Sequence, residues 1–437
     1  MAADHHVVPE LCSGERLACQ RELWTLDPSH LYFDGAGKAM LPRSSVNAGA
    51  TMVALLSQPW AVPGHEQPMR EVKQGYVELL GVGTPQDVAV APSTSYALSL
   101  VASSVKLRAG QQVVCLEAQS ASNVMQWQAC VKRCPGSQLT VVPRPKDAGQ
   151  GTWTSAVLAA IRAGDTALVA LPNVHWTDGW ALDLETISDA CREVEAMLCL
   201  DLTQSLGVLP FNGARVRPSV VACSVHKWLH AAHGFSLLYV DPLVLPTLAP
   251  LEEHERNRMG SDFPDWDNVG AMGRDGYPTR YFEGACRLDA GGRPSPVLVA
   301  ILHASIKFVM TFGPDRIAKY CRPLTQAIAD CARALGYLVP PEHAPHIVGL
   351  RKPKPHPSPE PVENASAGCK KRCRDLSDES FNIVQVRDAL KSRNIHASVR
   401  AGSLRLSVYL YTTDGDVQML CMALTEVTHQ LAPRIIE

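Results

Sequence analysis

The chain has 437 residues, a formal net charge of −2, and 46% hydrophobic and 19% charged residues, so it is long enough for one large domain and a smaller one. It has no basic stripe and no zinc-finger spacing, which argues against a nucleic-acid partner. Residues 1–10 are polar and no run of about eighteen apolar residues occurs, so we expect a cytoplasmic protein without a membrane partner.

The 14 cysteines are scattered along the chain, and many lie in apolar contexts, such as Cys115, Cys199 and Cys223. This usage indicates reduced, buried thiols rather than a disulfide framework. The pairs Cys130/Cys134 and Cys369/Cys373 have no matching second pair nearby, so we expect no metal site.

Short apolar runs alternate with helix-length amphipathic stretches between about residues 85 and 240. Such runs are typical of buried strands in a mostly parallel sheet that is covered on both faces. They lie at 87–91, 112–116, 139–142, 167–171, 196–200, 220–222 and 235–240. The pattern predicts a large doubly wound α/β domain over 45–295, with any ligand at the carboxyl ends of the strands.

Beyond residue 294 the pattern changes to a long apolar helix at 296–311, a second helix around 324–335 and a strand at 404–411 before a final helix. We interpret 296–437 as a smaller α+β domain, which the N-terminal segment 1–44 joins. The stretch 351–380 is rich in Pro, Lys, Arg and Ser and cannot bury enough apolar surface to order itself, so we expect a mobile surface insertion there.

Two strand ends carry the most informative side chains. The run 196–200 leads into Asp201, and a carboxylate at the end of a buried strand is costly unless a cation meets it. The run 220–222 leads into Ser224, His226 and Lys227, where apolar neighbours bury the lysine and lower its pKa toward a nucleophilic amine. The alternative for Lys227 alone is a lysine that extends to solvent, but the nearby buried carboxylate favours a paired chemical role.

Further polar groups fit the same kind of site. Ser93, Thr94 and Ser95 follow a strand and open a helix, where hydroxyls and free N–H groups can bind an anion or simply cap the helix. Gly292 allows close approach of the backbone to a ligand, or forms a plain turn. Arg405 alternates with apolar neighbours, so it either grips a carboxylate in a bidentate fork or faces solvent.

The stretch "DLTQSLGVLPF…SVHKWLHAAHGFSLLYV" resembles the cofactor-lysine region of the class-V aminotransferase superfamily. That superfamily includes cysteine desulfurases, selenocysteine lyases, isopenicillin-N epimerase-like proteins and C–S lyases of ergothioneine pathways. The other similar stretches are "LYFDGAGKAMLP", "PSTSYALSLVAS", "RLDAGGRPSP" and "LRLSVYLYTTDGDVQML". The order of these motifs matches the family over most of the chain.

The resemblance implies a pyridoxal 5′-phosphate (PLP) enzyme of fold type I that acts as a homodimer on a small amino-acid substrate. It implies that Lys227 carries the cofactor as a Schiff base and serves as base, and that Asp201 keeps the pyridine nitrogen protonated. Gln204 is then a donor to the cofactor phenolate oxygen. The implied phosphate site is Ser93, Thr94, Ser95, Ser224 and His226. Gly292 then reaches the neighbouring subunit's site, and Gly35, Ala36 and Arg405 lie on the substrate side.

Some positions depart from the family. Ser120 stands where cysteine desulfurases place a ring that stacks on the cofactor, so that partner is missing. His175 and Trp176 follow a strand on the other face, and we expect His175 to hydrogen-bond the cofactor and Trp176 to restore part of the ring contact. The stretch "NIHASVRAGSLRLS" contains no cysteine, which argues against persulfide transfer by the usual route.

These features favour a C–S lyase acting on a sulfur-substituted amino acid, on the basis of family analogy. An aminotransferase or an epimerase of the same fold is the alternative. A PLP-binding regulatory protein with weak catalysis is the alternative from another class, and a Rossmann dehydrogenase ranks last because no GxGxxG follows the first strand.

Overall fold

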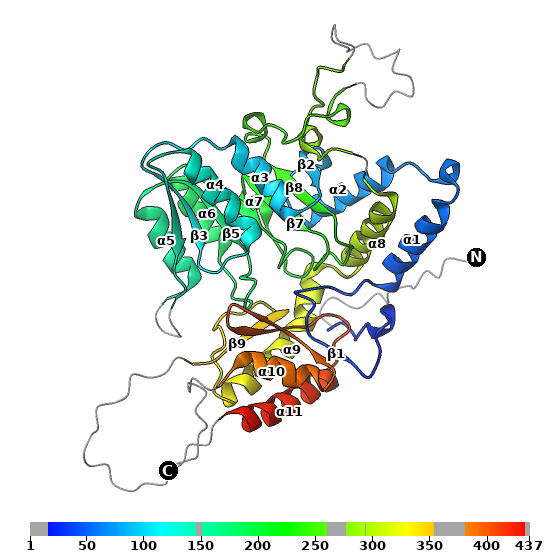
Figure 1. Ribbon diagram of the computed structural model, residues 1–437, viewed down its shortest axis with the longest axis vertical. Helices are drawn as coiled ribbons and strands as arrows, with labels where there is room; N and C mark the ends of the chain where they lie inside the picture. The colour runs from blue at the N-terminus through cyan, green and yellow to red at the C-terminus, as the bar shows by residue number, and fades with distance from the viewer. Residues whose placement is uncertain (1–15, 146–150, 260–276, 293, 354–380, 433–437) are drawn as a thin grey trace.

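The computed structural model describes residues 16–145, 151–259, 277–292, 294–353 and 381–432. Figure 1 shows a larger lobe built around a central sheet and a smaller lobe that contains both β1 and α11. The expected insertion at 351–380 lies almost wholly outside the described residues.

The central sheet has seven strands in the order β2-β8-β7-β6-β5-β3-β4. The strands are β2 (Val88–Ala91), β3 (Gln111–Leu116), β4 (Gln138–Val142), β5 (Asp165–Pro172), β6 (Met197–Asp201), β7 (Val220–Ser224) and β8 (Ser236–Val240). Every apolar run expected as a strand is confirmed as one. The pairs from β4 through β7 are parallel, and β8 is antiparallel to both of its neighbours.

Helices cover both faces of the sheet because successive strand side chains point to opposite sides. On β5, Val169 and Leu171 face one helix layer, and Leu168 and Ala170 face the other. The first layer holds α2 (Glu66–Leu80), α5 (Trp153–Arg162) and α6 (Leu184–Glu193), and the second holds α3 (Thr94–Ser104) and α4 (Met125–Arg133). The short α7 (Gly213–Val216) lies beside α6. The expected doubly wound α/β architecture is confirmed.

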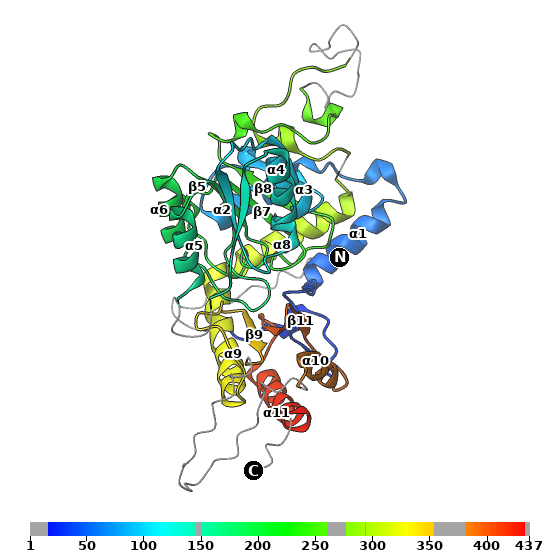
Figure 2. The same cartoon turned by 60° about the vertical axis from the view of Figure 1, so that its left-hand side comes forward.

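The smaller lobe packs long helices against a sheet of the order β11-β12-β9. Its elements are β1 (Leu31–Tyr32), α9 (Pro314–Ala334), β9 (Ile347–Arg351), α10 (Ile383–Lys391), β10 (Ile395–His396), β11 (Ser398–Arg400), β12 (Ser403–Ser407) and α11 (Asp414–Leu431). β1 pairs in parallel with β10, so the N-terminal segment joins the small domain through main-chain bonds. Figure 2 shows α10 and α11 beneath β11.

One domain boundary differs from the sequence expectation. Helix α8 (Pro296–Phe312) was assigned to the small domain, but its residues Leu302, Ile306 and Val309 belong to the apolar cluster of the large domain. It packs along α1 (Arg43–Leu55), where Ile301 lies against Gly49. Phe312, the last residue of α8, belongs to the apolar cluster of the small domain. Gly313, with a φ of +75°, then separates α8 from α9.

Among the described residues, no single helix is long and apolar enough to cross a membrane. Helices α8 and α9 together have the required length and composition, but they meet at an angle of 74°.

Candidate active site

A cavity of about 200 Å³ opens at the carboxyl ends of β5, β6 and β7. Loops and helix N-termini meet at this edge because the three strands are parallel. The expected site residues that line it are Thr94, Ser120, Asp201, Gln204, Ser224, His226 and Lys227. Side chains from separate parts of the chain therefore meet at one point.

Lys227 follows β7 and is held in a nonpolar setting. Its neighbours Val225 and Trp228 are buried. Burial lowers the pKa of Lys227 to about 8, and the charge of Asp201 opposes this shift. No ion pair or hydrogen bond holds its amine within the part of the chain that the structure describes.

Asp201 is the last residue of β6 and is 6% exposed. It accepts a hydrogen bond of 3.0 Å from the backbone N–H of Thr203. Burial raises the pKa of Asp201, and the bonds from Thr203 and the charge of Lys227 oppose the rise. No described residue forms an ion pair with Asp201. The carboxylate of Asp201 and the amine of Lys227 therefore line one cavity without forming an ion pair with each other.

A cluster of hydroxyl groups lies at the N-terminus of α3. Oγ1 of Thr94 is 2.6 Å from Oγ of Ser224, 3.3 Å from Oγ of Ser236 and 3.5 Å from Oγ1 of Thr203. Hydroxyls beside a helix N-terminus suit a phosphate group, because N–H groups and the helix dipole favour negative charge there. Thr203 was missed by sequence reasoning, although it stands two residues after Asp201 in the same motif.

The serines on either side of Thr94 have other roles. Ser93 is exposed and caps α3, because its Oγ accepts the N–H of Tyr96 at 3.1 Å. Ser95 donates to Ser122, which lines the cavity, at 3.0 Å. Of the three expected phosphate contacts at this helix start, the structure brings only Thr94 to the cavity wall.

Gln204 connects the cavity to the N-terminal segment. Its Nε2 donates to the carbonyl oxygen of Ala36 at 3.1 Å, and its Oε1 accepts from the indole of Trp228 at 3.0 Å. A side-chain amide carries two N–H groups, so one donor is left for a ligand. Ala36 contacts Gln204 through this bond, and Gly35 precedes it in the chain. Little space remains at Gly35, because a Cβ there would lie 3.0 Å from the hydroxyl of Tyr411.

Two rings border the cavity. The imidazole of His226 stacks on that of His233 with 3.9 Å between ring centroids. Burial, followed by His233, lowers the pKa of His226 to about 4, so it is a neutral imidazole at pH 7. Trp176 lines the cavity and donates from its indole to the carbonyl of Ala118 at 2.7 Å, whereas Ser120 offers only a hydroxyl.

Arg405 is 1% exposed and bound by protein groups. It donates to the carbonyl of Trp176 at 2.9 Å, to Ser398 at 3.1 Å and to Asp34 at 3.3 Å. Burial lowers the pKa of Arg405 to about 10, and Asp34 opposes the shift.

Arg400, which sequence reasoning missed, also lies over the indole of Trp176, with 5.9 Å between its guanidinium carbon and the ring centroid. No ion pair or hydrogen bond ties its guanidinium to another described residue. The positive charge of Arg400 helps to lower the pKa of Lys227. The strand β11 is three residues long, too short for an alternation that would have revealed this arginine.

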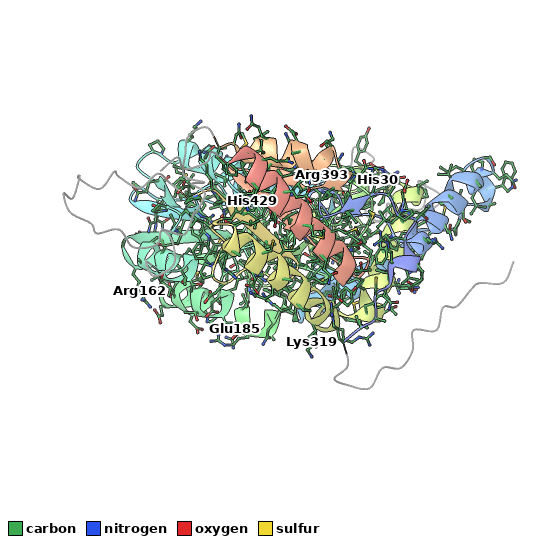
Figure 3. The ribbon with its side chains drawn as sticks, turned by 90° about the horizontal axis from the view of Figure 1, so that it is seen from below. His30, Arg162, Glu185, Lys319, Arg393 and His429 are labelled. Atoms are coloured by element: carbon green, nitrogen blue, oxygen red, sulfur yellow. The ribbon has the colours of Figure 1, made fainter. Side chains whose placement is uncertain are left out.

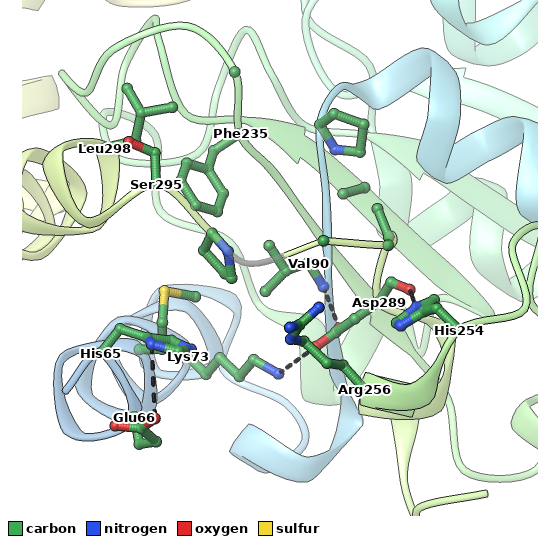
Figure 4. A pocket seen from close by; sticks show the side chains of 18 residues that line it. His65, Glu66, Lys73, Val90, Phe235, His254, Arg256, Asp289, Ser295 and Leu298 are labelled. Atoms are coloured by element: carbon green, nitrogen blue, oxygen red, sulfur yellow. Dashed lines mark hydrogen bonds and ion pairs between the residues drawn. The ribbon is translucent and has the colours of Figure 1, made fainter. Parts of the chain in front are cut away.

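His175 and Gly292 are also among the expected residues that do not line this cavity. His175 points away, because Val174 and Trp176 line the cavity and the intervening side chain faces the other side. Its ring nitrogens bond Thr177 at 2.8 Å and the carbonyl of Glu117 at 3.1 Å. Gly292 lies instead in a separate cavity of about 810 Å³. Figure 4 shows that cavity, with Lys73 pointing toward Asp289.

Comparison with known proteins identifies the family. Residues 31–343 match the model of the class-V aminotransferases. The chain therefore belongs to the class-V aminotransferase family, a family of PLP-dependent enzymes, and PLP is its cofactor.

Individual relatives are more distant. Isopenicillin N epimerase of Streptomyces clavuligerus is 24% identical over 412 residues, which cover 92% of this chain and 96% of that protein. An apo cysteine desulfurase from Thermococcus onnurineus NA1 superposes with a TM-score of 0.74 at 17% identity and covers 95% of this chain and 99% of its own. The cystine C–S lyase C-DES, in complex with cysteine persulfide, has a TM-score of 0.74 at 17% identity and covers 93% of this chain and 99% of its own. These structures share the fold.

The residues present fit the cofactor. A primary amine, a buried carboxylate and a cluster of hydroxyls at a helix N-terminus are the partners that an aldehyde, a pyridinium nitrogen and a phosphate require. Asp201 in particular lacks the cation that its burial calls for. Within the described ranges, no group of three or more His, Cys, Asp or Glu side chains could hold a metal ion, and Cys369 and Cys373 lie outside them.

Proposed function

We propose that the chain is a PLP-dependent C–S lyase that acts on a sulfur-substituted amino acid, with Lys227 as the residue that binds the cofactor covalently. The single observation behind the proposal is the pair Lys227 and Asp201. Both line one cavity, Asp201 buried and Lys227 partly buried, and neither has an ion-pair partner among the described residues.

Each residue has a defined task in this proposal. When bound, PLP withdraws electrons from the α-carbon of an amino acid. Asp201 holds the proton on the pyridine nitrogen, and the hydroxyls of Thr94, Ser224 and Thr203 bind the phosphate. Lys227 removes the proton from the substrate α-carbon, because burial brings its pKa close to neutrality.

The substrate carboxylate needs a cation near Lys227. Arg405 was the sequence candidate, but its guanidinium is already bonded to Trp176, Ser398 and Asp34. Arg400 has no such bonds within the described chain, and it lies over the same indole. We therefore assign the carboxylate contact to Arg400, with Arg405 holding Trp176 and Asp34 in place.

The choice of a lyase over a persulfide-carrying desulfurase rests on the cysteines. None of the residues found to line the cavity is a cysteine, and the stretch 394–407 contains none. The sulfur leaving group would then depart into solvent rather than onto the protein.

Transamination and epimerisation start from the same loss of the α-proton, and we retain them as alternatives. A regulatory protein that binds PLP with weak catalysis is a further alternative. A homodimer and a cytoplasmic location remain proposals; Gly292 and the 810 Å³ cavity would belong to the subunit interface of such a dimer.

The test begins with the absorbance of the purified protein, of Lys227→Ala and of Lys319→Ala as a control. Lys319 is exposed on α9, where Figure 3 labels it, and it forms an ion pair with Asp315. We expect the wild type and the control to show the visible band of covalently bound cofactor, and Lys227→Ala to lack it. The proteins are then mixed with L-cystine, L-cysteine, cysteine S-conjugates or L-alanine, and pyruvate, ammonia and sulfide are measured.

Pyruvate and ammonia in equal amounts from a sulfur substrate support the lyase. Amino transfer that depends on an added 2-oxo acid supports the aminotransferase, and loss of optical activity without product supports the epimerase. A protein that cannot take up PLP would refute the proposal altogether.

A further inference from the structure

Two half-buried cysteines lie against each other on the long helices of the small domain. Cys331 is near the end of α9 and Cys421 is in the middle of α11. The two helices lie side by side on the face seen in Figure 3. Sγ of Cys331 is 3.8 Å from the carbonyl oxygen of Cys421, although the residues are 90 positions apart in the sequence. Neither cysteine lines the candidate active site.

The two cysteine side chains influence each other. The side chain of Cys421, with help from the hydroxyl of Thr425, lowers the pKa of Cys331, and the side chain of Cys331 raises the pKa of Cys421. A lowered pKa favours the thiolate of Cys331, which is the nucleophilic form. By contrast, burial raises the pKa of Cys115 to about 11 and that of Cys191 to about 12.

Access and geometry both permit a reaction at this pair. Cys331 and Cys421 are half-buried, whereas Cys199, Cys223 and Cys321 are fully enclosed. A small oxidant reaches a half-buried sulfur, and a helix core excludes it. A disulfide also needs its two residues close enough to bridge without backbone movement. The 3.8 Å between Sγ of Cys331 and the carbonyl oxygen of Cys421 places the two residues side by side on adjacent helices.

We propose that Cys331 and Cys421 form a redox modification site, in which hydrogen peroxide converts the two thiols to an intramolecular disulfide. The thiolate of Cys331 attacks one peroxide oxygen and the O–O bond breaks. The hydroxide that leaves takes up the proton that the Cys331 thiol had released, so a sulfenic acid and a first water result. The thiol of Cys421 then attacks the sulfenic sulfur and displaces a second water. Two thiols are oxidised by two electrons and one peroxide is reduced to two waters, so atoms and electrons balance.

The disulfide joins α9 to α11 and encloses the residues between positions 331 and 421 in one loop. Those residues include β9 and the strand pair β11–β12, which carries Arg400 and Arg405. A cross-link over a long chain segment stabilises mainly by restricting the unfolded chain. Oxidation therefore raises the unfolding temperature of the small domain, and a dithiol reductant reverses the rise.

The test uses the full-length holoprotein treated with a small excess of hydrogen peroxide. Free thiols are blocked by alkylation, and the protein is analysed by intact mass and by peptide mapping without reductant. We expect a loss of two hydrogens and one cross-linked peptide pair containing Cys331 and Cys421, in the monomeric protein. Peptide mapping of the wild type requires no substitution, so a variant that fails to fold does not affect this result.

Variants then assign the bond. Cys331→Ser and Cys421→Ser should each abolish the cross-linked peptide and the oxidative rise in unfolding temperature. Cys286→Ser is the matched control, because Cys286 is half-buried but burial raises its pKa, and it should react like the wild type. A cross-link between other cysteines, or a sulfinic acid on Cys331 with Cys421 still free, overturns the proposal.

Discussion

The carbonyl oxygen of Trp176 accepts a hydrogen bond of 2.9 Å from Nη1 of Arg405, which joins a loop of the large domain to strand β12 of the small one. The same guanidinium binds Asp34 at 3.3 Å. Arg405 therefore holds two sides of the candidate active site together. Arg400 lies over the same indole without such bonds to described residues, so the two arginines should respond differently to removal.

Arg400→Ala should raise the KM for the amino-acid substrate by roughly 10- to 150-fold, since a charge-assisted hydrogen bond contributes about 1.5–3 kcal/mol. Its unfolding temperature should match the wild type. Arg405→Ala should instead lower the free energy of unfolding by about 2 kcal/mol, because it removes the buried cation that pairs with Asp34 and the donor to the carbonyl of Trp176. Steady-state kinetics and denaturant unfolding of both variants separate these effects. Equal loss of stability in the two variants would contradict the assignment.

Uptake of PLP by the apoprotein should depend on pH with a midpoint near 8. The neutral amine attacks the cofactor aldehyde, and burial lowers the pKa of Lys227 to about 8. Below that pH the uptake rate should fall about tenfold per unit, because the protonated fraction grows, and above it the rate should level off. Stopped-flow absorbance after mixing with PLP measures the rate. Asp201→Asn should move the midpoint lower, since Asp201 raises this pKa; a midpoint near that of a free lysine, about 10.4, would contradict the prediction.

Asp201→Asn should also weaken the stabilisation that PLP gives the folded protein. The carboxylate has a raised pKa from burial and lacks a cationic partner among the described residues, so its removal should leave the apoprotein at least as stable. A tenfold loss of affinity reduces the effect of PLP by about 1.4 kcal/mol. Thermal unfolding with and without PLP measures the difference. Asp241→Asn is the control, because Asp241 also follows a strand and accepts the N–H two residues on, at 2.8 Å.

Gly179→Ala should destabilise the loop that carries Trp176. Gly179 has a φ of +80°, and a Cβ there would collide with the carbonyl group of Ile347 in the small domain. Gly110 has a φ of +88° with open space around it, so Gly110→Ala isolates the backbone cost of about 1 kcal/mol. We expect Gly179→Ala to cost about 3 kcal/mol or more by urea unfolding. A similar loss in the two variants would mean that the loop adapts to the added methyl group.

The strands of the large domain were predictable because each is a continuous apolar run, a pattern that needs only local information. Lys227 and Asp201 were predictable for a related reason, since charges directly after such runs stand out. The start of α9 at Pro314 was not predictable in the same way. The sequence indicated a helix only around 324–335, and the break at Gly313 depends on a positive φ that composition does not reveal.

Sequence reasoning misplaced some side chains because it locates a residue along the chain but does not show which way its side chain points. His175 stands beside two residues that face the cavity, and its own ring points the other way onto Trp153, at 5.3 Å between centroids. Arg405 was expected to be free for substrate, but its partners Asp34 and Trp176 come from two distant segments. Residue type and spacing locate a site, whereas the pairing among its charges appears only in three dimensions.

The parallel pairing of β1 with β10 also affects how a growing chain matures on the ribosome. Leu31 pairs with Ile395, and the N–H of Ala36 donates to Ser407 at 3.0 Å. The segment that supports Gln204 therefore lacks its small-domain partners until residues near 407 have been synthesised. The large domain, which supplies the residues found to line the cofactor cavity, can collapse early. The segment that contacts Gln204 is held by the small domain only after residues near 407 have been synthesised, so a nascent chain should acquire PLP late and a chain stalled before that point should not retain it.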